Sequence, residues 1–128
     1  MRLVFDPVFG EVDLTASAEE LAGLASAVAE GDGFIKSTAP VDTDTLAGIE
    51  VRKASGSGVR IDVDASRRVL LIGGDSSARA ILADNLQAMA EAGEGGHLHI
   101  DYVPEHPYLV EGSMPVVVNS PHGGTPSR

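Results

Sequence analysis

Short stretches in which apolar and polar residues alternate predict strands near the start of the chain. Residues 2–6 place Leu3 and Phe5 on one face, and residues 11–16 repeat the alternation. Residues 7–10 between them contain Pro and Gly, which are typical of a tight turn. The first sixteen residues therefore predict a β-hairpin.

The pattern then changes to a helical period. Ser17 and Glu20 have the spacing of a capping box, in which each side chain bonds the other residue's backbone N–H. The apolar residues that follow at helical spacing are Leu21, Leu24, Ala25 and Val28. Glycines at 31 and 33 predict the end of this helix.

The middle of the chain is less regular. Residues 34–38 are compatible with a strand, whereas Pro40 and the neighbouring Asp and Thr residues up to 48 favour a loop. Residues 49–54 alternate again, and the Ser-Gly-Ser-Gly segment 55–58 predicts a flexible turn.

A second strand–strand–helix unit follows this turn. Val59, Ile61 and Val63 share one strand face, and residues 68–72 are apolar on both faces, which predicts a central strand covered on both sides. Asp75 is placed to cap a helix over residues 76–92. The predicted apolar stripe of that helix consists of Ala78, Leu82, Leu86, Met89 and Ala90.

The order strand, turn, strand and capped helix thus occurs twice, at 2–31 and 59–92, and suggests two ββα repeats. The matching residues, at a constant spacing, are Val12 with Val69, Leu14 with Leu71, and Leu24 with Ile81. With further strands at 97–103 and 115–118, we predict an α+β domain over residues 1–118. We expect a mostly antiparallel sheet of about six to eight strands with two helices packed on one face. Residues 119–128 are predicted to be a flexible tail.

Composition narrows the class of protein. The 128 residues suffice for one domain, and 43% of them are hydrophobic, so a core can form. The net charge of −10 disfavours nucleic acids and anionic membranes as partners and favours a basic protein, although solubility alone is the simpler explanation. No cysteine is present, which excludes disulfides and Cys-based metal sites. The N-terminal residues lack a secretory pattern and no apolar run spans a bilayer, so we expect a cytoplasmic protein.

Residues 97–103 hold the strongest candidate chemistry. In a strand, His97, His99 and Asp101 project from one face, while the apolar residues 98, 100 and 102 face the core. Two imidazoles on one strand face can bind a metal together with a carboxylate. The alternative is a polar face on which histidines lie beside acids, which would make the surface pH-sensitive.

Three stretches of the chain resemble a known family. They are RLVFDPVFGEVDL, DNLQAMAE and GGHLHIDYVPEHPYLVEGSMPVVV. They are similar to small actinobacterial immunity proteins of polymorphic toxin systems, the family numbered thirty-two in that series. The resemblance implies a cytoplasmic protein without enzymatic activity that binds and neutralises a cognate toxin. An acidic protein suits a basic, nuclease-like toxin.

We therefore predict a small binding protein that occludes its toxin's active site, without cofactor, metal, nucleic acid or membrane; its oligomeric state stays open. The predicted contact residues are His97, His99, Asp101, Glu105, His106, Tyr108 and Glu111. Tyr108 is either an exposed interface anchor or a residue packed over the end of the sheet. The rival hypothesis is a metal-dependent enzyme or small-molecule binder centred on His97, His99 and His106. A third is a structural or regulatory domain without ligand.

Overall fold

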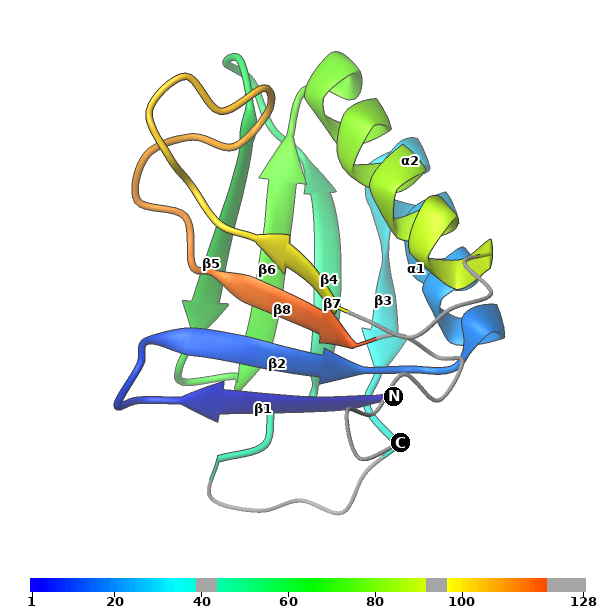
Figure 1. Ribbon diagram of the computed structural model, residues 1–128, viewed down its shortest axis with the longest axis vertical. Coiled ribbons are helices and arrows are strands. Elements are labelled where there is room, and N and C mark those ends of the chain that lie inside the picture. The colour runs from blue at the N-terminus through cyan, green and yellow to red at the C-terminus, as the bar shows by residue number, and fades with distance from the viewer. Residues whose placement is uncertain (39–43, 92–96, 120–128) are drawn as a thin grey trace.

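The computed structural model describes residues 1–38, 44–91 and 97–119, which form two helices and two four-stranded sheets (Figure 1). Sheet A contains, in spatial order, β1 (Arg2–Asp6), β2 (Glu11–Thr15), β8 (Val116–Asn119) and β7 (His97–Ile100). Sheet B contains β3 (Asp32–Lys36), β4 (Gly48–Lys53), β6 (Val69–Gly74) and β5 (Val59–Asp64). The helices are α1 (Ala18–Glu30) and α2 (Ser76–Glu91). The predicted α+β class is confirmed.

The arrangement of the sheets differs from the prediction. The strands form two mixed sheets and not one mostly antiparallel sheet, because β2 pairs in parallel with β8 and β4 in parallel with β6. The strands of sheet A cross in front of those of sheet B, and the two helices lie side by side along one side of the molecule (Figure 1). Alternation in a sequence identifies the buried face of each strand but not its partner, and parallel neighbours are far apart in the chain.

Both sheets and both helices contribute side chains to one core. A small internal space is lined by Leu14, Leu24, Ile49, Ile61, Leu70, Ile72, Leu82, Leu86, Ile100, Val116 and Val118. Each sheet therefore turns one face inward and leaves the other face to solvent.

The predicted repeat is present and extends beyond the two ββα units. Each half of the chain runs strand, strand, helix, strand, strand, from β1 to β4 and from β5 to β8, and each sheet takes two strands from each half. In sheet A, Leu3 lies opposite Leu14, and in sheet B, Ile61 lies opposite Ile72 in the same way. Each residue of the first pair is 58 positions before its counterpart in the second pair.

The spacing predicted from the sequence, 57 positions, is therefore wrong by one. Leu24 corresponds to buried Leu82, whereas its predicted match, Ile81, is 40% exposed. Residues 69–72 are all apolar, so the sequence offers two registers for this strand. A shift by one residue exchanges the two faces of a strand, and only the packed core selects between them.

The helix ends follow from local chemistry. The Ser17 hydroxyl accepts a hydrogen bond from the Glu20 amide at 3.0 Å, and the Glu20 carboxylate accepts one from the Ser17 amide at 2.9 Å, as the capping box predicts. Asp75 caps α2 by accepting from the Ala78 amide at 3.3 Å. Gly31 ends α1 with φ of 80°, and an added Cβ there would lie 2.6 Å from the Arg79 guanidinium.

Three predicted boundaries change. The His-rich strand ends at Ile100 and does not continue to residue 103, because the chain leaves sheet A there. Asn119 belongs to β8 and not to the predicted tail, whose remaining residues, 120–128, lie outside the described part of the chain. In the undecided segment 34–48, β3 covers 32–36 and residues 39–43 are outside the description.

Candidate functional site

The histidine strand forms one edge of sheet A. His97 and His99 are exposed, whereas Leu98 is half-buried and Ile100 is 3% exposed. This confirms the predicted alternation, with the imidazoles on the outer face and the apolar side chains inward. Asp101 follows the strand and is also exposed.

Acidic side chains from the neighbouring strands complete this outer face. His99 lies opposite Val117, which lies beside Asp13, and Asp6 lies opposite Glu11 at the far edge of the sheet. We call this surface the acidic face. It consists of Asp6, Glu11, Asp13, His97, His99 and Asp101. The three N-terminal acids lie about ninety residues before the predicted site, and pairing over such a separation depends on packing and not on local pattern. No feature of the sequence indicates that β2 pairs with β8, so these acids could not be added to the site in advance.

A chain of hydrogen bonds crosses the acidic face. The His97 Nδ1 lies 2.7 Å from the Asn119 Oδ1, and the Asn119 Nδ2 donates to the Asp13 Oδ1 at 2.6 Å and to the Thr15 hydroxyl at 3.1 Å. An amide oxygen only accepts, so His97 donates through Nδ1. These bonds join β7, β8 and β2 and fix the position of one imidazole. Asn119 is a site residue outside the predicted set, because the residues that follow it have the composition of a loose tail and hide the end of β8.

The loop after β7 has a different role. Residues 108–114 run along the outer edge of β5, where the Val59 amide donates to the Tyr108 carbonyl at 2.7 Å and the Met114 amide donates to the Ile61 carbonyl at 2.7 Å. The loop thus satisfies backbone groups at an edge of sheet B. The predicted contact residues of the loop therefore lie on a different part of the surface from the histidine strand.

Tyr108 packs inside this loop. Its side chain is only 6% exposed, so the expectation of an exposed aromatic anchor is wrong and packing over the sheet end is correct. Burial raises the pKa of its phenol, and a side-chain hydrogen bond with Asn85 opposes this effect. His106 packs edge-to-face on the Tyr108 ring at 4.6 Å, and its Nδ1 accepts from the amides of Tyr108 and Leu109 at 3.2 and 3.0 Å.

Glu105 and Glu111 are the exposed members of the loop set. Glu105 has φ of 67°, a left-handed conformation within the turn that precedes His106. The structure therefore divides the seven predicted residues into two groups. Three lie on β7 or directly after it, and four lie in the following loop, which reaches the edge of sheet B.

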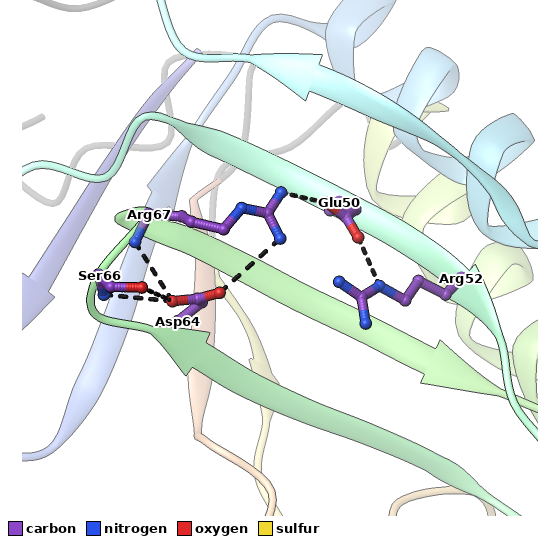
Figure 2. Close-up of polar contacts among 5 residues, drawn as sticks. All are labelled: Glu50, Arg52, Asp64, Ser66 and Arg67. Atoms are coloured by element: carbon purple, nitrogen blue, oxygen red, sulfur yellow. Dashed lines mark hydrogen bonds and ion pairs between the residues drawn. The ribbon is translucent and has the colours of Figure 1, made fainter.

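The outer face of sheet B carries a separate charged cluster (Figure 2). The Glu50 carboxylate accepts hydrogen bonds from Arg67 and Arg52, which lower its pKa, the Arg67 bond most. The Asp64 carboxylate accepts from the Ser66 hydroxyl at 2.8 Å, which lowers its pKa, and it lies 3.7 Å from the Arg67 Nη1. On this face Glu50, Asp62 and Asp64 are thus each paired with an arginine.

Two further observations concern a metal site and a membrane-spanning helix. Among residues 1–38, 44–91 and 97–119, no three His, Asp or Glu side chains are grouped so that they could hold one metal ion. No helix within these ranges has the length and apolar character needed to cross a membrane.

Comparison with known proteins gives one match. No curated protein and no solved structure is significantly similar to the chain. The matched segment runs from β6 through α2, β7 and the following loop into the residues after β8, and so includes the histidine strand. Residues 69–121 match the model of the family described as Immunity protein 32.

Proposed function

We propose that the protein is an immunity protein that binds a cognate protein toxin and neutralises it through the acidic face. The observation that carries the proposal is the family match over residues 69–121, because it suggests an immunity function and contains β7 and β8. In this proposal the protein acts in the cytoplasm by binding and not by catalysis.

The charge of the acidic face indicates the kind of toxin. The strands of sheet A carry three acids, Asp6, Glu11 and Asp13, and a single basic residue, Arg2. Asp101 adds a fourth carboxylate beside the end of β7. A surface of one sign accelerates encounter with a partner of the opposite sign and disfavours acidic competitors. The partner that fits is a toxin with a basic surface, such as a nuclease whose substrate is polyanionic.

The hydrogen bonds across this surface support one mode of neutralisation. A sheet face held by cross-strand hydrogen bonds, such as those from Asn119 to Asp13 and Thr15, presents fixed side chains to a partner. Fixed polar groups lose little conformational entropy on binding. We expect the acidic face to cover the basic substrate-binding surface of the toxin and thereby occlude its active site.

The test begins with co-expression of the protein and the toxin encoded by the neighbouring gene. We expect the wild-type protein to restore growth and to form a complex whose affinity falls with added salt. Failure to restore growth with any toxin gene adjacent to its own would contradict the immunity function.

A pair of charge reversals then tests the surface. Asp101→Lys on the acidic face is expected to weaken toxin binding by about tenfold or more, because a steering carboxylate becomes a repelling ammonium. The matched control is Asp62→Lys, since Asp62 is also a carboxylate on an outer sheet face but pairs with Arg60 on sheet B. Calorimetry measures the affinity of both variants for the toxin. Equal losses of affinity would reject the acidic face as the toxin-binding surface but would not contradict the immunity function.

A further inference from the structure

The turn between β1 and β2 exposes two large apolar side chains. Val8 is 84% exposed and Phe9 is 76% exposed, more than any of the other exposed large apolar residues among those described. The turn projects from the end of sheet A away from both helices (Figure 1). Neither side chain belongs to the core, so the fold does not explain them.

Local hydrogen bonds hold this turn in one conformation. The Asp6 carboxylate accepts from the Val8 amide at 2.9 Å and from the Phe9 amide at 3.2 Å, and the Asp6 carbonyl accepts from the Gly10 amide at 2.8 Å. Gly10 has φ of 64°, where a side chain is rarely tolerated. A rigid turn that presents an aromatic ring has lost part of its conformational entropy before a partner arrives.

Acids surround the base of the turn. Asp6 and Glu11 face each other where the hairpin begins and ends, and Asp13 follows Glu11 on the same face of sheet A. The turn is therefore continuous with the acidic face, and its apolar tip stands beside negative charge. A complementary surface would have an apolar recess with basic side chains around it.

We infer that the β1–β2 turn is an anchor that inserts Phe9, supported by Val8, into an apolar recess with a basic rim on the toxin. This inference rests on the proposed function and adds a second contact region to it. Interface energy is concentrated in a few buried aromatic residues surrounded by polar contacts, which is the arrangement of Phe9 and the acids beside it. The turn lies outside the segment 69–121 that matches the family model, so the anchor is a contact region separate from the matched strands.

The experiment measures binding of the purified neighbouring-gene toxin, inactivated by substitution, to four forms of the full-length protein. They are the wild type, Phe9→Ser, Val8→Ser and the control Phe34→Ser. Phe34 is also an exposed phenylalanine, 52% exposed, but it lies within β3 on the outer face of sheet B. We expect Phe9→Ser to weaken binding about 30-fold or more and Val8→Ser to weaken it less, with Phe34→Ser unchanged.

The outcomes separate this inference from the proposed function. Unchanged thermal midpoints in the variants show that the loss of affinity is a loss of contact, because exposed side chains add little to stability. If the wild type binds and Phe9→Ser binds equally well, the anchor is overturned and the immunity function stands. If the wild type does not bind, both are overturned. If the wild type sediments as a dimer and Phe9→Ser as a monomer, the turn contacts a second copy and the anchor is likewise overturned.

Discussion

The two halves of the chain have similar residues at corresponding positions of the core but different residues on their outer faces. Corresponding positions in the core hold similar apolar residues; the pairs are Leu3 and Ile61, Val12 and Leu70, Leu14 and Ile72, Leu24 and Leu82, Ala25 and Ala83, and Val28 and Leu86. Close packing accounts for this likeness, since one side-chain volume fits a given place in a repeated core.

The outer faces of the two sheets are not alike. At the positions that hold Asp13 and His99 in sheet A, sheet B holds Leu71 and Phe34. The strands of sheet B carry four basic and four acidic residues, whereas those of sheet A carry one and three. A repeated fold needs a repeated core but not a repeated outer face. The acidic face, where the repeat is broken, is therefore the better place to expect a function.

The largest expected effects test the likeness of the two interiors. Leu24→Ala and Leu82→Ala each remove a fully buried side chain from corresponding helix positions, so each should reduce the free energy of unfolding by about 3 kcal/mol. Urea denaturation measures both. The control is Ile81→Ala, at the position that a spacing of 57 would match to Leu24; since Ile81 is 40% exposed, its loss should be below about 1 kcal/mol. A larger loss for Ile81 than for Leu82 would reject the 58-residue correspondence.

Much of the fold was predictable because its signals are local. The capping box at Ser17, the glycine at 31 and the alternation in residues 11–15 each act within a few residues, and the corresponding elements were confirmed. The hairpin of β1 and β2 was also predicted and is confirmed, but the pairing of strands that are far apart in the chain was not predictable in this way. The parallel contacts of β2 with β8 and β4 with β6 depend on packing between segments far apart in the chain, and no local pattern specifies them.

The candidate site was predictable only in part for the same reason. Alternation placed His97, His99 and Asp101 on an outer face. The structure confirms this for the two histidines, whereas Asp101 is exposed but lies beyond the end of β7. Whether a loop residue such as Tyr108 is buried depends on what lies beneath the loop, here the edge of β5, and its sequence neighbours do not report this. Whether these residues contact a toxin stays a prediction.

An intermediate effect is expected at the position where the interiors differ. Arg79 occupies the place in α2 that Leu21 holds in α1, and it is 4% exposed. Its guanidinium donates at 2.9 Å to each of three carbonyls, those of Gly74, Val28 and Ala29. The positive charge also lies at the C-terminal end of α1, where the helix dipole favours a cation.

Arg79→Leu gives this position the residue of its counterpart in α1. It should reduce the free energy of unfolding by about 2 kcal/mol, because it removes the donors of the Val28 and Ala29 carbonyls. The Gly74 carbonyl, in contrast, keeps a hydrogen bond from the Ala54 amide. Urea denaturation gives the difference, and hydrogen exchange should show the C-terminal turn of α1 as the region that loses protection. Arg79→Lys keeps the charge but cannot reach all three acceptors, so it should fall between the wild type and Arg79→Leu. If Arg79→Leu is as stable as the wild type, the three hydrogen bonds make no net contribution to the free energy of unfolding.

The smallest expected effect concerns the outer face of sheet B and depends on pH. Hydrogen bonds from Arg67 and Arg52 lower the pKa of Glu50 below its ordinary value of 4.5 (Figure 2). A carboxyl whose pKa is lower in the folded than in the unfolded state contributes stability above the unfolded pKa and loses it as the pH falls through the folded pKa. Glu50→Gln should therefore be slightly less stable than the wild type at pH 7, and the difference should disappear as the pH falls below 4.5.

The measurement is the difference in thermal midpoint between Glu50→Gln and the wild type, followed from pH 7 down to about pH 2.5. The lower limit lies roughly two units below the ordinary carboxyl pKa, so Glu50 becomes protonated within the scan. The effect at pH 7 should be small because the pairs are exposed to solvent and screened by salt. Glu111→Gln is the control, since its exposed carboxylate has no ion pair within the described ranges, and its difference from the wild type at pH 7 should be smaller still. The thermal midpoints of Glu50→Gln and the wild type could instead differ by the same amount at both ends of the scan. In that case the arginine hydrogen bonds do not stabilise the ionised carboxylate. The contrast between a sheet B whose acids are neutralised by arginines and an acidic sheet A then loses its physical basis.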